Sequence, residues 1–154
     1  MRQAWLWGGL IVTALAAHRI QAGDDVVPHV VLGIHGGTGA DKKDMTPDLD
    51  RRLRLLLTEA LKAGQARLQS GGVSLDAVET AIRVMEDSPL LNAGKGAVFT
   101  HEGRNELDAS IMDGQTKKAG AVAGVTIVRN PITAARAVME KSKHVLFIGR
   151  GAEI

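Results

Sequence analysis

The hydrophobic and polar positions of the chain predict a long amphipathic helix over residues 47–70. Leucines and alanines recur there at spacings of three and four residues, and arginine, lysine and glutamate occupy many of the positions between them. This spacing places the apolar side chains on one face of a helix. Gly71 and Gly72 follow, and a glycine after the last turn commonly ends a helix because it adopts the left-handed conformation readily.

A second amphipathic helix is predicted between Ser74 and Pro89. Ser74 is a suitable N-cap, and Asp76 falls in the first turn, where a negative charge is favourable to the helix dipole. Glu79 and Arg83 have the i,i+4 spacing of a helical ion pair. Pro89 is expected to end the helix. Both helices are interpreted as packing elements without a chemical role.

Strands and turns are predicted for much of the remaining chain. Residues 29–35 form an apolar run that ends in glycines, which is typical of a buried strand that delivers a loop to the end of a sheet. Asn130 and Pro131 are expected to open a helix that continues to 139–142, because proline is favoured in a first turn. The other predicted elements are strands over 97–100, 106–112, 121–128 and 144–148, the last of them buried, and turns at 101–104, 113–114 and 149–152.

This order of elements predicts the fold class. Strands alternate with helices, and the last predicted strand has no helix after it to cover the sheet. Alternation of this kind is typical of a layered α/β/α domain. A sheet left bare on one side exposes apolar surface and open edges. We therefore expect an α/β fold that is incomplete within this sequence.

Residues 1–22 have the pattern of a secretory signal. Arg2 gives a positive start, residues 4–17 form an apolar run, and small residues suited to cleavage occur at 16–17 and at Ala22. The run is short for a membrane span, and an uncleaved anchor or a buried first helix is the alternative. We expect cleavage after Ala22, export to the periplasm or outside the cell, no membrane attachment after cleavage, and a mature domain over 23–154.

The charge and composition of the mature region argue against nucleic acid as a partner. The net charge of +2 comes from Arg2 and Arg19 in the leader, so the rest of the chain is neutral, and it has no basic run. Its only aromatic residues are Phe99 and Phe147, which provide little surface for stacking on bases. The absence of cysteine from the sequence excludes disulfides, a thiolate nucleophile and cysteine-bound metal.

Three features could carry chemistry, and the residues alone leave alternatives open for each. The glycines at 36–39 lack the spacing of a dinucleotide or P-loop motif, and His35 before them is either a catalytic base or a structural residue. The loop 86–96 could turn several carbonyls toward a hard monovalent cation, or it is an ordinary helix-to-strand connection. Glu106 and Asp108 share a strand face, but nothing indicates a sugar cleft, so structural carboxylates are favoured over a glycosidase pair.

An ordered set of short motifs resembles one enzyme family. The motifs are IHGGTG at 34–39, NAGKGAVFT at 92–100, ELDASIMDG at 106–114, AGAVAG at 119–124, NPI at 130–132, AR at 135–136 and VME at 138–140. Together they resemble the α-subunit half of the plant-type L-asparaginases, also called isoaspartyl peptidases, over residues 30–152. Glycosylasparaginases are related by fold, but the glycine loop after His35 fits the asparaginase branch better.

The resemblance implies a fold, an activity and a set of site residues. The implied fold is a four-layer αββα N-terminal-nucleophile hydrolase, made as a self-cleaving precursor, and it is incomplete without its β-subunit half. The implied partners are that β-subunit half, in an (αβ)2 dimer, and the small-molecule substrates L-asparagine and β-aspartyl dipeptides. By position, Asn92 lies close to the nucleophile, and Gly36 and Gly37 belong to the loop implicated in self-cleavage. No organic cofactor is implied, and a structural sodium ion is expected on the backbone carbonyls of Met85, Glu86, Ser88, Leu91, Ala93 and Lys95.

The nucleophile itself is expected outside the sequence. The resemblance places the catalytic threonine and the oxyanion donors beyond Ile154, so the chain alone is expected neither to hydrolyse asparagine nor to cleave itself. The preference between asparagine and isoaspartyl peptides depends on residues in the same missing half. The alternative hypothesis is a non-catalytic product that binds amino acids or partner subunits. A Gly-Thr pair followed by a β-subunit-like stretch after Ile154 would decide for the enzyme.

Overall fold

Three helices and a three-stranded sheet make up the part of the chain that the computed structural model describes, residues 30–37 and 42–154. The predicted signal over 1–22 lies outside these residues. The chain divides into the units Met1–Val30 and Val31–Ile154, and every element below belongs to the second. The elements are α1 (Pro47–Gln69), α2 (Ser74–Glu86), β1 (Leu107–Met112), β2 (Ala119–Val125), α3 (Pro131–Lys141), β3 (Leu146–Ile148) and the 3-10 turns η1 (Lys42–Asp44), η2 (Gly94–Gly96) and η3 (Gly149–Ala152).

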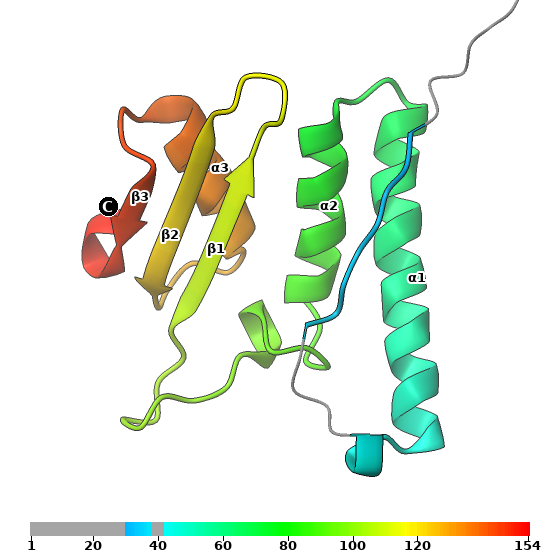
Figure 1. Ribbon diagram of the computed structural model, residues 1–154. Helices are drawn as coiled ribbons and strands as arrows, with labels where there is room; N and C mark the ends of the chain where they lie inside the picture. The colour runs from blue at the N-terminus through cyan, green and yellow to red at the C-terminus, as the bar shows by residue number, and fades with distance from the viewer. Residues whose placement is uncertain (1–29, 38–41) are drawn as a thin grey trace, which may run out of the picture. The chain divides into compact units, whose positions relative to one another are not determined.

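Helices α1 and α2 form a closely packed pair, which confirms both predicted helices (Figure 1). Helix α1 begins after Thr46, whose hydroxyl accepts a hydrogen bond from the Leu49 amide. The pair is tight at Gly64, because a Cβ at this position would lie 2.9 Å from the Ala77 carbonyl oxygen. The N-cap prediction for α2 is wrong in detail. Ser74 is the first helical residue, and Val73 occupies the cap position without a side-chain hydrogen bond.

The sheet has the strand order β1-β2-β3, with β2 antiparallel to β1 and parallel to β3. The register shifts between Leu107 and Ala109, and there the Asp108 carboxylate accepts a hydrogen bond from the Gly124 amide at 2.8 Å. Asp108 therefore has a structural contact, in agreement with its structural interpretation. The sheet, together with the three helices, confirms the prediction of an α/β fold.

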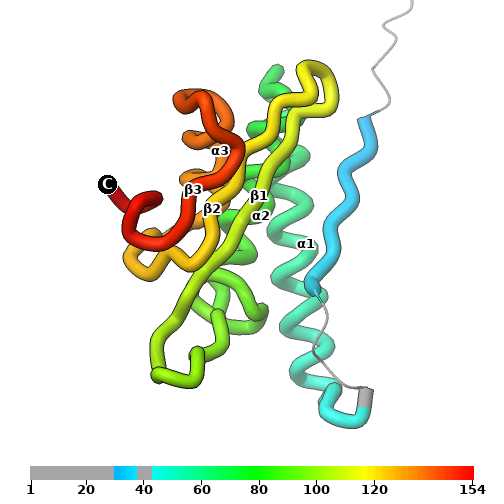
Figure 2. The backbone as a smooth tube through the Cα atoms, turned by 60° about the vertical axis from the view of Figure 1, so that its left-hand side comes forward, coloured from blue at the N-terminus to red at the C-terminus, as the bar shows by residue number. Residues whose placement is uncertain are grey.

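Helix α3 covers one face of the sheet, behind the strands in the view of Figure 2. The core lies between α3 and the sheet and consists of Ile111, Val122, Val125, Ile132, Ala135, Val138 and Met139. On the other face the larger apolar side chains remain exposed: Met112 to 60%, Leu146 to 50% and Ile148 to 66%. The prediction of a buried strand at 144–148 is wrong for the described chain. Strand β3 lies at the edge of the sheet, and Phe147 is its only residue that packs against the core.

Two further strand predictions are wrong. Residues 31–37 have no neighbouring strand with which to pair in the described chain, and the backbone groups of residues 97–100 form other hydrogen bonds. Residues 31–37 are extended and alternate in burial, with Leu32 and Ile34 half-buried, but no described strand pairs with them. These two side chains line a cavity with residues of α2, and a helix surface offers no ladder hydrogen bonds. Residues 97–100 are irregular, because asparagine side chains and the Thr100–Arg104 turn take their backbone groups.

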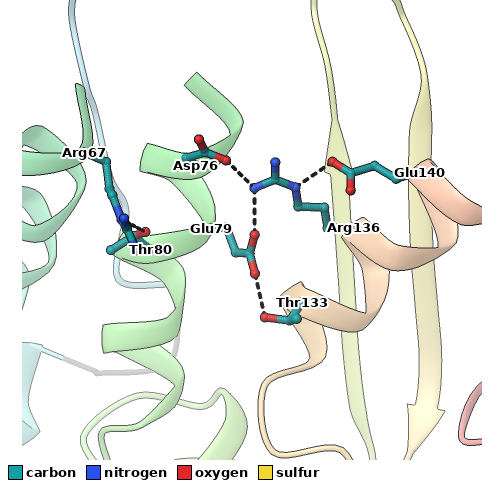
Figure 3. Close-up of polar contacts among 7 residues, drawn as sticks. All are labelled: Arg67, Asp76, Glu79, Thr80, Thr133, Arg136 and Glu140. Atoms are coloured by element: carbon teal, nitrogen blue, oxygen red, sulfur yellow. Dashed lines mark hydrogen bonds and ion pairs between the residues drawn. The ribbon is translucent and has the colours of Figure 1, made fainter. Parts of the chain in front are cut away.

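A polar cluster around Arg136 joins α2 to α3 (Figure 3). The guanidinium contacts Asp76 at 2.7 Å and Glu79 at 2.8 Å on α2, and Glu140 at 2.7 Å on its own helix. Glu79 also accepts a hydrogen bond from the Thr133 hydroxyl, so the predicted pairing of Glu79 with Arg83 is replaced by contacts to α3. The hydrogen bond from Arg136 lowers the pKa of the Asp76 carboxyl.

Among the described residues, no helix is long and apolar enough to span a membrane. The longest helix, α1, carries charged residues along its exposed side, including Arg51, Arg52 and Arg54. The predicted leader lies outside this finding.

We expect Gly120→Ala to lower the free energy of unfolding by about 1–3 kcal/mol. Gly120 faces α3, and a Cβ there would clash with the Ala135 carbonyl oxygen and the Met139 backbone nitrogen. Chemical denaturation measures the change. Gly114→Ala is the matched control, since a Cβ at Gly114 meets open space. Equal denaturation midpoints for the two variants would contradict the close approach of β2 and α3.

Candidate functional site

Two of the segments singled out by sequence meet beside Leu91. The Gly36 position lies against this side chain, since a Cβ at Gly36 would be 3.6 Å from the Leu91 Cδ2 atom. Leu91 directly precedes Asn92 on the loop after α2. The structure thus brings the beginning of the glycine segment next to the predicted Asn92 loop, although the two are more than fifty residues apart. The loop residues 38–41 lie outside the described part of the chain.

The histidine before the glycines is bound to its own loop. His35 Nδ1 accepts a hydrogen bond from the Gly37 amide at 3.1 Å, and Gly37 has a φ of +90°, which favours glycine. The imidazole is exposed. This local contact supports the structural interpretation of His35 over the catalytic one.

The loop that follows α2 is wound tightly by its own backbone hydrogen bonds. The Ser88 amide donates to the Met85 carbonyl, the Ala93 amide to the Leu91 carbonyl, and the Gly96 amide to the Ala93 carbonyl. Within this winding, the Ser88 hydroxyl accepts a hydrogen bond from the Leu90 amide at 3.2 Å. The loop is therefore held in a compact course by its own hydrogen bonds.

Two glycines make this winding possible. A Cβ at Gly94, which has a φ of +49°, would clash with the Glu86 carbonyl oxygen. A Cβ at Gly96 would clash with the Leu91 carbonyl oxygen and lie 3.0 Å from that of Pro89. Carbonyl oxygens crowded around small residues are a donor set that suits a hard cation. The described residues contain no cluster of histidine and carboxylate side chains that could hold a metal ion.

Asn92 is exposed within this loop, and its side chain bonds to the backbone just after η2. Its Oδ1 accepts a hydrogen bond from the Val98 amide at 3.0 Å. Asn105, on the far side of the next turn, donates from Nδ2 to the carbonyls of Ala97 at 2.8 Å and Val98 at 3.2 Å. Two asparagine side chains therefore hold the segment that follows η2.

A buried carboxylate fixes the start of the loop. Glu86 is 3% exposed, and its Oε1 accepts a hydrogen bond from the Ile132 amide at 3.0 Å, in the first turn of α3. Its Oε2 is buried without a hydrogen-bond partner among the described residues. Burial raises the pKa of this carboxyl. Asp87 next to it is bound by Arg129 and Asn130, which lie just before α3.

Comparison with known proteins identifies the family to which this chain belongs. Residues 28–154 match the family model described as asparaginase. The chain belongs to the asparaginase family. This confirms the resemblance seen in the motifs of the sequence.

Three relatives of the asparaginase-family chain show the extent of the similarity. It is 52% identical to an isoaspartyl peptidase of Salmonella typhimurium over 124 residues, covering 80% of this chain and 40% of the relative. It is 51% identical to an isoaspartyl peptidase of Escherichia coli over 124 residues, which cover 80% of this chain and 39% of the relative. It is 49% identical to a plant-type L-asparaginase of Pyrococcus abyssi over 125 residues, again 80% of this chain and 39% of the relative. The chain therefore spans about two fifths of the length of these relatives.

Within this asparaginase-family chain, the predicted site residues are placed as follows. Gly36 and Asn92 lie on segments that meet at Leu91, and Gly37 extends beyond that contact. The six residues of the predicted sodium set all lie on the end of α2 or on the wound loop after it: Met85, Glu86, Ser88, Leu91, Ala93 and Lys95. The roles of these residues in catalysis, self-cleavage and ion binding stay predictions.

Sequence reasoning missed the side chains of Glu86 and Asn105. A signal for Glu86 was present, because Glu86 and Asp87 place two acids at the end of α2, where the helix dipole disfavours negative charge. Acids in that place indicate a partner on another element. Asn105 gave no such signal, because its acceptors become neighbours only when the turn forms.

We expect Glu86→Ala to lower the free energy of unfolding by about 1–2 kcal/mol, the usual effect of losing a helix cap. The Asn130 side chain does not cap α3, so Glu86 supplies the acceptor for its first turn. Chemical denaturation measures the loss. Glu86→Gln is the control, because its amide oxygen can still accept from Ile132. A stability loss as large in the glutamine variant as in the alanine variant would contradict the capping role.

Proposed function

We propose that this chain is the α-side portion of an L-asparaginase/isoaspartyl peptidase. The enzyme hydrolyses the side-chain amide of L-asparagine to aspartate and ammonia, and it cleaves β-aspartyl dipeptides. The observation that carries the proposal is the match of residues 28–154 to the asparaginase family, with relatives about 50% identical that are named for these two activities. The meeting of the Gly36 and Asn92 segments supports it, because both were singled out by position in the family.

The proposed mechanism uses a threonine nucleophile from the part of the enzyme that this chain does not contain. Self-cleavage frees the threonine as an N-terminal residue, and its own α-amino group serves as the base. The hydroxyl attacks the amide carbon, donors stabilise the oxyanion, and the C–N bond breaks to release ammonia or the peptide amine and leave an aspartyl ester on the threonine. Water then hydrolyses this ester and releases aspartate. The present chain contributes the support of that site. Its wound loop holds the Asn92 amide at the surface, where the proposed nucleophile comes close.

We also propose that the described sheet is one layer of a four-layer αββα fold. The support is the face opposite α3, which carries exposed Met112, Leu146 and Ile148 next to the small side chains of β2. An apolar sheet face of this kind is covered in a stable domain. In the proposal the β-subunit half supplies the second sheet, and two such αβ units pair into an (αβ)2 dimer.

The leader and localisation form a separate proposal. The pattern of residues 1–22 supports an exported enzyme, periplasmic or secreted, that is free of the membrane after cleavage. N-terminal sequencing of the mature protein from its native host tests this. Recovery of a cytosolic form that retains Trp5 would overturn it.

A structural sodium ion is proposed on the carbonyls of the wound loop. The clash that any Cβ at Gly94 or Gly96 would make with loop carbonyls supports the fit of this donor set. A bound ion would hold the loop closed and thereby stabilise the fold. No organic cofactor is included in the proposal.

For the complete enzyme we expect sodium chloride to raise the free energy of unfolding by about 1–3 kcal/mol over choline chloride at equal ionic strength, for an ion present at ten to a hundred times its Kd. Thermal denaturation in the two salts measures the difference. Gly96→Ala should abolish it, because the added Cβ displaces the Leu91 carbonyl. Gly114→Ala should leave it unchanged. Equal stability of the unsubstituted enzyme in both salts would overturn the sodium proposal.

The function is tested on the product of the complete coding region. We expect two chains after self-cleavage, the second beginning with threonine, and release of ammonia from L-asparagine and of aspartate from β-aspartyl dipeptides. Replacing that threonine by valine should abolish both cleavage and turnover. Residues 23–154 alone should be inactive. An intact, inactive product that binds amino acids or a partner subunit would favour the non-catalytic alternative.

A further inference from the structure

The backbone around Ala97 and Val98 is held from two sides by asparagine side chains. On one side the Val98 amide donates to Asn92 Oδ1 at 3.0 Å. On the other side Asn105 Nδ2 donates to the Ala97 carbonyl at 2.8 Å and to the Val98 carbonyl at 3.2 Å. This stretch has no strand partner among the described residues, so these side-chain hydrogen bonds take the place of a ladder.

The contact with Val98 fixes which end of the Asn92 amide faces outward. A backbone N–H can only donate, so the side-chain oxygen of Asn92 must face Val98. Its Nδ2 then points away from Val98, and no described residue accepts a hydrogen bond from it. Because Asn92 is exposed, it presents two N–H donors at the surface. Donors of this kind bind an acceptor such as a hydroxyl, a carbonyl oxygen or a developing oxyanion.

The turn between Thr100 and Arg104 closes without Asn105. The Thr100 amide donates to the Arg104 carbonyl at 2.7 Å, and the Gly103 amide donates to the Thr100 carbonyl at 3.0 Å. The Asn105 side chain reaches past this turn to Ala97 and Val98. Its two hydrogen bonds therefore restrain the peptide that holds Asn92, and they are not needed to form the turn itself.

We propose that Asn105 is a positioning residue for Asn92. It holds the Val98 amide in place, the Val98 amide holds the Asn92 oxygen, and Asn92 thereby keeps its Nδ2 donors directed toward the reacting atoms. The inference rests on the proposed function, in which Asn92 lies beside the nucleophile. It adds two points to that function. Asn105 sets the orientation of the Asn92 amide, and the group that this amide binds is a hydrogen-bond acceptor.

The decisive variant is Asn105→Asp, which has nearly the same shape but replaces the donor with an oxygen that faces two carbonyl oxygens. Loss of these hydrogen bonds should lower kcat about tenfold in the complete enzyme, with KM little changed, if the Asn92 donors act mainly in the transition state. Asn105→Gln, which keeps an amide donor, should recover part of the activity. Glu102→Gln is the matched control in the same turn, because the exposed Glu102 makes no hydrogen bond or ion pair in the described chain.

A double-mutant cycle separates positioning from general loss of stability. If Asn105 acts through Asn92, adding Asn105→Asp to Asn92→Ala should lower kcat little further. Independent effects of the two substitutions on kcat would overturn the proposal. So would an unchanged kcat in Asn105→Asp. If Asn105→Asp does not fold, Asn105→Gln is combined with Asn92→Ala in the same cycle.

A measurement that does not depend on activity keeps this inference distinct from the proposed function. Hydrogen exchange of the Val98 amide should be about tenfold faster in Asn105→Asp than in the unsubstituted protein and unchanged in Glu102→Gln. Unchanged exchange would overturn the link from Asn105 to Asn92 even in an active enzyme. If the unsubstituted enzyme is inactive but Val98 exchange is still faster in Asn105→Asp, the proposed function is refuted and the link from Asn105 to Asn92 stands.

Discussion

The buried hydrogen bond from the Ile132 amide to the Glu86 carboxylate is the contact on which the placement of the candidate site depends. It joins the end of α2 to the beginning of α3, and α3 in turn packs on the sheet. A carboxylate at this depth is costly unless a donor meets it, and a helix N-terminus provides donors and a favourable dipole. The wound loop starts at Glu86, so its origin is tied to the sheet layer. Asp87 adds an ion pair with Arg129 at the same junction, and Arg136 joins the two helices again nearer the beginning of α2, through Asp76.

Close backbone approach is the second constraint, and glycine supplies it at each critical point. Gly64 lets the two long helices touch, Gly120 lets β2 lie against α3, and Gly96 lets the loop close on its own carbonyls. In each case an added Cβ would meet backbone atoms, and at Gly64 it would also meet the end of the Leu32 side chain. The small-residue composition of the chain is therefore a packing requirement, and it also creates the crowded carbonyls to which we assign the sodium ion.

The chemistry proposed for the enzyme requires this chain to act as a scaffold. Its best-placed polar groups at the loop are the amides of Asn92 and Asn105, which donate and accept hydrogen bonds but serve neither as nucleophile nor as base at neutral pH. In the proposed function these amides support a site that the rest of the enzyme completes. The chain spans about two fifths of the length of these relatives. The apolar sheet face opposite α3 is consistent with the same division of the fold.

The sequence by itself determined the helices α1, α2 and α3, the β1–β2 hairpin and the family, because helical periodicity, proline and glycine signals and motif order are local properties of the chain. Tertiary structure alone decided the pairing of Glu79 with Arg136, the capping of α3 by Glu86, and the irregular course of residues 97–100. These depend on groups 57, 46 and 8 residues apart in sequence, respectively. The strand expected at 29–35 shows the same limit. Its described part has the alternating burial of a strand, but a ladder also requires a partner, and the pattern of one segment cannot specify the partner's position.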